Sequence, residues 1–77
     1  MRIDEKYGVI THAVAGEIVW DDLTRCNRRI LRVDFDKFDN VAYWLECDEA
    51  EMERTGGGRY PWEISPPRTK PAPEAGN

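Results

Sequence analysis

The sequence is poor in the side chains that carry most enzyme and metal chemistry. It contains one histidine, His12, and two cysteines, Cys26 and Cys47, none at the close spacing that a structural zinc site requires. Any nucleophilic serine or cysteine would need that single histidine as its base, and Ser65 lacks the flanking glycines of a nucleophile elbow. We therefore expect no enzymatic activity, no metal ion and no cofactor.

Long apolar runs are also missing. No stretch approaches the roughly 20 apolar residues needed to span a bilayer, and the start of the chain lacks the apolar core of a signal peptide. Two cysteines are too few for a disulfide framework, so free thiols are expected. These absences predict a cytoplasmic protein with no membrane contact.

Length and composition limit the chain to one small domain. A chain of 77 residues has a small core, but 40% hydrophobic and 34% charged residues are typical of a globular fold. Four of the five prolines fall in residues 66–77, which carry no large apolar side chain. We expect a folded domain over residues 1–65 and a flexible proline-rich tail over residues 66–77.

Alternating apolar side chains predict a β-hairpin. The alternation is clearest in residues 31–36 and 41–47, and the intervening turn contains Asn40, which suits a left-handed backbone. The apolar faces of the two strands must pair, which places Phe35 opposite Val41 around a three-residue loop. The buried face of this hairpin is predicted to contain Leu31, Val33, Phe35, Tyr43 and Leu45.

Three weaker strand patterns accompany the hairpin. Residues 7–14 and 17–20 are rich in β-branched side chains, and residues 59–65 predict a last edge strand with Trp62 and Ile64 facing inward. Only these segments and the hairpin show strand periodicity. The sequence thus predicts a mostly β domain of four or five short strands.

One short acidic helix is expected before the last strand. Asp48 can cap the helix, Glu51 falls at the third helical position where it completes a capping box, and Gly56 can end the helix. Since acidic side chains are frequent in this helix, it should lie on the surface.

The order of these segments resembles a known architecture. Residues 31–36, 41–46 and 60–64 resemble the middle and end of an SH3-like barrel of the KOW or Tudor kind, where a hairpin is followed by a connecting loop and a short closing strand. The resemblance covers about half of the chain. It implies a small SH3-like antiparallel barrel or roll that acts as a binding module.

Charge is strongly segregated along the chain. Between Asp34 and Glu53 there are eight acids and one lysine, a net charge of −7 against −4 for the whole chain. A polarised surface of this kind steers partners over about a Debye length. We expect a partner-binding surface made of Asp36, Phe38, Asp39, Trp44, Glu46, Asp48, Glu49 and Glu51.

The aromatic side chains leave several interpretations open. The six tyrosines and tryptophans could all belong to the core, or Trp44 and Phe38 could form an exposed anchor for a partner. A third alternative is a methyl-lysine cage of the Tudor type, which requires three aromatics around one pocket.

A basic cluster offers an alternative function. It consists of Arg25, Arg28, Arg29 and Arg32. These side chains could bind the phosphates of a nucleic acid, but pairing with Asp21, Asp22, Asp34 and Asp36 is favoured because acids surround the cluster.

The expected function is therefore a non-enzymatic binding module that engages a protein partner through an acidic surface with exposed aromatics. In a sharper form, that surface imitates nucleic acid and occupies the basic channel of a DNA- or RNA-handling machine. In size and charge the chain resembles small acidic phage inhibitors such as anti-CRISPR proteins. The alternative is an SH3-like protein that binds nucleic acid through the arginine cluster.

Overall fold

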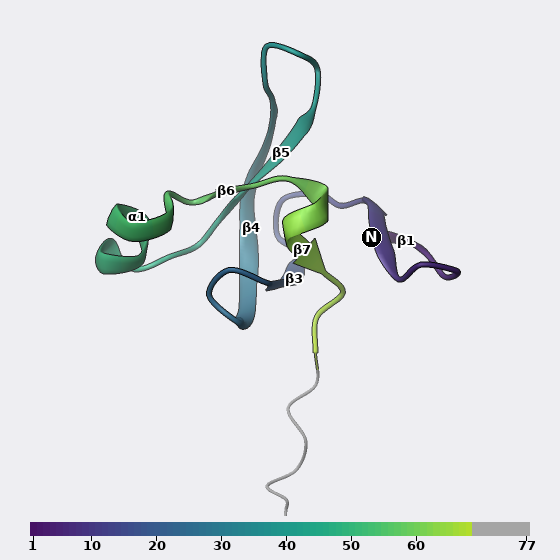
Figure 1. Ribbon diagram of the computed structural model, residues 1–77, viewed down its shortest axis with the longest axis horizontal. Coiled ribbons are helices and arrows are strands. Elements are labelled where there is room, and N and C mark those ends of the chain that lie inside the picture. Colours follow the sequence, from purple (N-terminus) through teal and green to yellow (C-terminus); the bar gives the residue numbers. More distant parts are fainter. Residues whose placement is uncertain (69–77) are drawn as a thin grey trace, which may run out of the picture.

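The computed structural model describes residues 1–68, which form a mostly β fold with one short helix (Figure 1). The elements are β1 (Arg2–Asp4), β2 (Val9–His12), β3 (Ile18–Asp21), β4 (Cys26–Phe35), β5 (Val41–Leu45), α1 (Glu49–Thr55), β6 (Gly58–Arg59), a 3-10 turn (Pro61–Glu63) and β7 (Ile64–Ser65). The predicted mostly β class and the predicted acidic helix are confirmed, but residues 1–68 contain seven short strands rather than four or five. Most of the predicted tail, residues 69–77, lies outside the described residues.

The strands form two antiparallel sheets. Five strands make the larger sheet, in the order β6-β5-β4-β3-β7, and β1 pairs with β2 in a separate hairpin. The ten-residue β4 is the central strand, with β3 on one side and β5 on the other. Within residues 1–68 the edge strands β6 and β7 form no ladder with each other, so the sheet is open rather than a closed barrel.

The β4–β5 hairpin has the predicted register. Phe35 lies opposite Val41, and the backbone N–H of Asp36 donates to the carbonyl of Asn40 at 2.9 Å, which leaves a three-residue loop. The left-handed residue is Asp39, with φ of 65°, rather than the predicted Asn40. A three-residue hairpin loop needs this conformation at its last position, which Asp39 occupies.

The predicted buried face is only partly correct. A β-bulge shifts the register between Ile30 and Arg32, so Ile30 lies opposite Leu45 and is fully buried, whereas Leu31 is 55% exposed. Because the bulge adds one residue to β4, the alternation of core-facing side chains is shifted by one position between the two sides of the bulge. Phe35 shares a face with Val41, but it is the last residue of β4 and its side chain is exposed. The end of the β4–β5 hairpin extends beyond the body of the protein (Figure 1).

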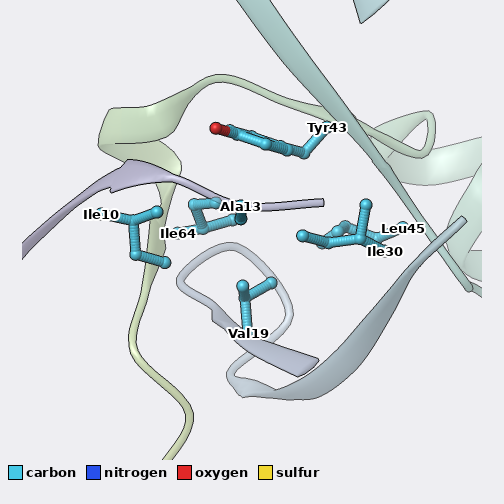
Figure 2. Close-up of a cluster of buried hydrophobic side chains, with 7 residues drawn as sticks. All are labelled: Ile10, Ala13, Val19, Ile30, Tyr43, Leu45 and Ile64. Carbon is cyan, nitrogen blue, oxygen red and sulfur yellow. The ribbon is translucent and has the colours of Figure 1, made fainter. Parts of the chain in front are cut away.

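The core is small and gathers side chains from five strands and one loop. It contains Ile10, Ala13, Val19, Ile30, Tyr43, Leu45 and Ile64 (Figure 2). Tyr43, Leu45 and Ile64 are buried as predicted. Trp62, predicted to face inward, is exposed because residues 61–63 form a 3-10 turn, in which strand alternation does not apply.

Helix α1 begins and ends as the sequence predicts. The Asp48 carboxylate accepts from the backbone N–H of Glu51 at 2.8 Å, and the Glu51 carboxylate accepts from the backbone N–H of Asp48 at 3.0 Å. Gly56 follows the helix with φ of 74°, a conformation that favours glycine. With seven residues, α1 is too short to cross a membrane, and no other α-helix occurs in residues 1–68.

Candidate functional site

A buried ion pair between Arg59 and Asp21 links strands β6 and β3 of the larger sheet. Arg59 Nε donates to Asp21 Oδ1 at 2.8 Å and Arg59 Nη2 donates to Asp21 Oδ2 at 3.1 Å, with both side chains fully buried. The remaining N–H groups of Arg59 donate to Thr55 and to the carbonyl of Gly58. The pair therefore ties β6 and the end of α1 to β3.

The Asp21 carboxyl is ionised in this setting. Burial by itself would raise its pKa, but hydrogen bonds from Arg59, Thr24 and the backbone of Leu23 outweigh the burial and hold the pKa below its usual value. These hydrogen-bond donors lie in β6 and in the turn that follows β3. The arrangement serves stability, and the sequence pattern does not predict it because neither residue belongs to an apolar alternation.

The arginine cluster is largely paired, as the sequence favours. Arg28 contacts Glu51 and lies 3.5 Å from Asp21, and Arg32 Nε donates to Asp34 at 2.7 Å. Two of the four expected acidic partners, Asp21 and Asp34, are therefore confirmed. Arg29 pairs more loosely with Glu46 at 3.8 Å, and Arg25 lies exposed in a turn with φ of 61°.

The two other acids expected to pair with arginine have different partners. Asp22 lies 3.4 Å from the Ser65 hydroxyl, and Asp36 accepts a hydrogen bond from the Tyr60 hydroxyl at 3.1 Å.

An open groove of about 590 Å³ runs beside the paired arginines. Its charged lining is Arg28, Arg29, Glu46, Asp48 and Glu51. With more acids than arginines in its wall, this groove has no excess positive charge for phosphate.

Asp36 organises the loop of the β4–β5 hairpin. Its carboxylate accepts from the backbone N–H groups of Phe38 at 2.8 Å and Asn40 at 2.9 Å, and from the Asn40 side chain at 3.2 Å. These bonds, the Asn40 backbone bond foremost, lower the pKa of Asp36, while the same carboxylate raises the pKa of Tyr60. Asp36 thus fixes the loop that presents Phe38 and Asp39.

The projecting end of the hairpin combines acids with exposed aromatics. We call residues 34–39 the hairpin surface; Phe35 is 68% exposed and Phe38 73% exposed within it. Asp39 is also exposed at the tip, beside Lys37, whose ammonium lies 5.2 Å from the Phe38 ring centre. Two large aromatic side chains are therefore exposed close together at this end of the molecule.

Trp44 lies at the base of the hairpin rather than at its tip. It pairs with Arg32 across the sheet, and the Arg32 guanidinium lies 4.9 Å from the centre of its ring. Three residues of strand, about 10 Å, and the loop separate Trp44 from Phe38. The two aromatics therefore do not meet in one anchor.

The acids predicted after β5 divide into paired and exposed groups. Asp48 and Glu51 are engaged in the capping box, and Glu51 also contacts Arg28. Glu46 pairs with Arg29, while Glu49 is exposed on the first turn of α1. Glu46 and Asp48 are exposed despite these contacts, and of these four acids only Glu51 is half-buried.

Soft ligands are dispersed in the structure. Cys26 and Cys47 are free, half-buried thiols, and burial raises the pKa of Cys47. Across residues 1–68, His, Cys, Asp and Glu side chains form no group of three or more that could hold a metal ion.

No protein-family model, curated protein or solved structure matches this chain.

Proposed function

We propose that this protein is a non-enzymatic binding module that engages a protein partner through the hairpin surface. The observation that carries the proposal is the exposure of Phe35 and Phe38 on a hairpin that extends beyond the core. Exposed aromatics contribute little to the stability of the free protein, yet their desolvation is a common source of binding free energy.

The loop is organised before any partner binds. Three donors from Phe38 and Asn40 and the hydroxyl of Tyr60 converge on the Asp36 carboxylate. A loop held in one conformation loses less entropy on association, so more of the contact free energy appears as affinity. This supports a recognition role for the segment.

The charge of the hairpin surface indicates which kind of partner it would bind. The hairpin surface holds Asp34, Asp36 and Asp39 against one lysine, and Glu49 and Glu53 add exposed acids on α1. A partner with a basic surface would therefore associate faster at low salt. The complementary surface is one rich in lysine or arginine.

The same reasoning supports a sharper form of the proposal, in which the protein occupies the basic channel of a DNA- or RNA-handling machine, as small acidic phage inhibitors do. Arginines partly neutralise Asp34, Glu46 and Glu51, so charge alone is a weak mimic of a phosphate backbone. Aromatic burial at Phe38 supplies the remaining affinity. Competition between a DNA duplex and this protein for the captured partner separates the two forms.

We also propose that the larger sheet is an open relative of the SH3-like roll. Support comes from the β4–β5 hairpin, the loop that follows it and the short strand β7, which pairs with β3 after a 3-10 turn. In this proposal α1 is an insertion in the loop before the closing strand.

Affinity capture from the native host, with partners identified by mass spectrometry, tests the proposal. The tagged full chain is compared with Phe38→Ala and with Tyr7→Ala, a control that removes a similarly exposed aromatic (69%) from the turn between β1 and β2. The proposal expects a partner that wild type and Tyr7→Ala retain and Phe38→Ala loses. Equal retention by both variants would contradict it.

A further inference from the structure

A second surface adjoins the hairpin surface, on the outer face of the same two strands. Opposite residues in an antiparallel pair share a face, which places Asp34 with Ala42 and Trp44 with Gly58. Alternation adds Tyr60, two residues after Gly58, and its hydroxyl reaches Asp36 across the face. These residues enclose an open groove of about 450 Å³, which we call the outer groove.

The shape of the outer groove follows from small residues between large ones. Its lining residues are Asp34, Phe35, Asp36, Ala42, Trp44, Gly56, Gly57, Gly58 and Tyr60. Ala42 lies on β5 two residues from Trp44. Its short side chain leaves open a space that a larger side chain would fill. A Cβ at Gly58 would lie 3.5 Å from the Trp44 ring, an ordinary packing distance, so the indole lies directly over β6.

The chemistry of the outer groove favours a cation. The outer face contributes two aromatic side chains, Trp44 and Tyr60, and two carboxylates, Asp34 and Asp36, and none of the lining residues is basic. Aromatic faces carry negative electrostatic potential, and nearby carboxylates strengthen the attraction for a positive group. Hydrogen bonds hold the pKa of Asp36 below its usual value, so that carboxylate is charged at neutral pH.

The protein itself shows which cation suits the wall. The Arg32 guanidinium lies 4.9 Å from the Trp44 ring centre while its Nε donates to Asp34 at 2.7 Å. A planar guanidinium can stack on an indole and bind a carboxylate at once, and it loses less hydration than an ammonium in an open site. Arg32 is largely exposed, so it can move aside for another group.

We propose that the outer groove receives an arginine side chain of the partner protein, stacked against Trp44 beside the Tyr60 ring and paired with Asp34, while the Asp36 carboxylate adds longer-range attraction. This deepens the proposed function and rests on it, because it names the group that a basic partner would present beside the hairpin surface. Arg32 then acts as an internal competitor for the same wall.

Nuclear magnetic resonance titration of the full chain tests the inference without a partner. The probe is a short capped glycine peptide with one central arginine, compared with matched peptides carrying citrulline or lysine. The arginine peptide should shift the Trp44 indole N–H and the Ala42 and Gly58 amides, and should bind about tenfold more tightly than the citrulline peptide. Equal shifts with citrulline would overturn the inference, and tighter binding of lysine would overturn the assignment of a guanidinium.

Two variants locate the site. Ala42→Leu fills the groove without removing a wall and should weaken the arginine peptide about tenfold, while Arg32→Ala removes the internal competitor and should tighten binding several-fold. Arg32→Ala changes an exposed side chain and does not depend on core packing, so it remains informative if Ala42→Leu fails to fold. Weaker or unchanged binding in Arg32→Ala would contradict the inference.

Phe38→Ala separates this inference from the proposed function. Phe38 does not line the groove, so the variant should bind the arginine peptide like wild type while losing the captured partner. If Phe38→Ala loses the partner but no arginine peptide binds wild type, the inference fails and the proposed function stands. If the arginine peptide binds but Phe38→Ala keeps the partner, the hairpin proposal fails instead.

Discussion

Arg59 and Asp21, 38 residues apart in the chain, form a bidentate ion pair that no water reaches, because both side chains are fully buried. The pair joins β6 to the end of β3, on opposite sides of the β4–β5 hairpin in the sheet order. Removing one member of such a pair leaves an uncompensated charge in the interior. The open sheet therefore depends on a polar contact as well as on its small apolar core.

Asp21→Ala should lower the free energy of unfolding by about 3–5 kcal/mol, because Arg59 would remain buried without its carboxylate. Urea denaturation followed by circular dichroism measures this. Asp22→Ala is the matched control, since Asp22 is exposed and, within residues 1–68, its carboxylate makes only long contacts of 3.4 Å to Ser65, and it should cost less than about 0.5 kcal/mol. A loss below about 1 kcal/mol in Asp21→Ala would contradict a stabilising role for the pair.

Stability should fall in acid and stay level near neutral pH. The pKa values of Asp21 and Glu51 are lowered in the folded state from ordinary values of 3.8 and 4.5. A depressed pKa contributes stability that is present above the unfolded value and is lost as the pH falls through the folded one. Unfolding free energies measured in urea from pH 7 downward should therefore decline below about pH 5.

Glu51→Gln supplies the test of that assignment. It removes one of the titrating groups while keeping the size of the side chain, and it should make the decline shallower. Identical acid profiles for wild type and Glu51→Gln would show that the Glu51 carboxylate, which accepts from the Asp48 backbone N–H and contacts Arg28, does not couple to folding.

The β4 bulge predicts opposite results for neighbouring residues. Ile30→Ala removes a fully buried side chain and should cost about 2–5 kcal/mol, whereas Leu31→Ala changes an exposed side chain and should cost less than about 0.5 kcal/mol. Thermal or urea unfolding of both variants measures the difference. If Leu31→Ala were the more damaging, the register of β4 described here would be wrong.

Local chemistry explains which parts of the fold are predictable from the sequence. The Asp48 and Glu51 capping box and the Phe35 to Val41 register depend on residues close in sequence, and both are confirmed. The bulge at Leu31 is not predicted, because inserting one residue in a strand leaves the alternation on either side unchanged. Strand β1 is missed because three residues show no periodicity.

The candidate site likewise has features that the sequence predicts and features that it does not. Exposure of Phe38 at the hairpin tip follows from the turn, and it is confirmed. The outer groove unites β4, β5 and the segment after α1, so its formation depends on the pairing of Trp44 with Gly58, which no local pattern specifies. The Arg59 to Asp21 pair is likewise invisible in the sequence, since burial of two charged residues requires knowledge of their contact.

Nucleic acid should bind weakly at physiological salt. Arg28, Arg29 and Arg32 are paired with carboxylates, and phosphate would have to displace those partners. Fluorescence anisotropy with labelled duplex DNA and single-stranded RNA measures the affinity. Submicromolar binding that is lost when these three arginines are changed to alanine would favour the alternative function.

The most direct test of the central claim is surface plasmon resonance with the captured partner. Phe38→Ala should accelerate dissociation about 30-fold, which corresponds to about 2 kcal/mol, because the exposed ring is buried in the complex. Asp39→Asn, which keeps the side-chain shape, should mainly slow association and reduce its salt dependence. Dissociation and association rates unchanged in both variants would show that the hairpin surface does not bind the partner.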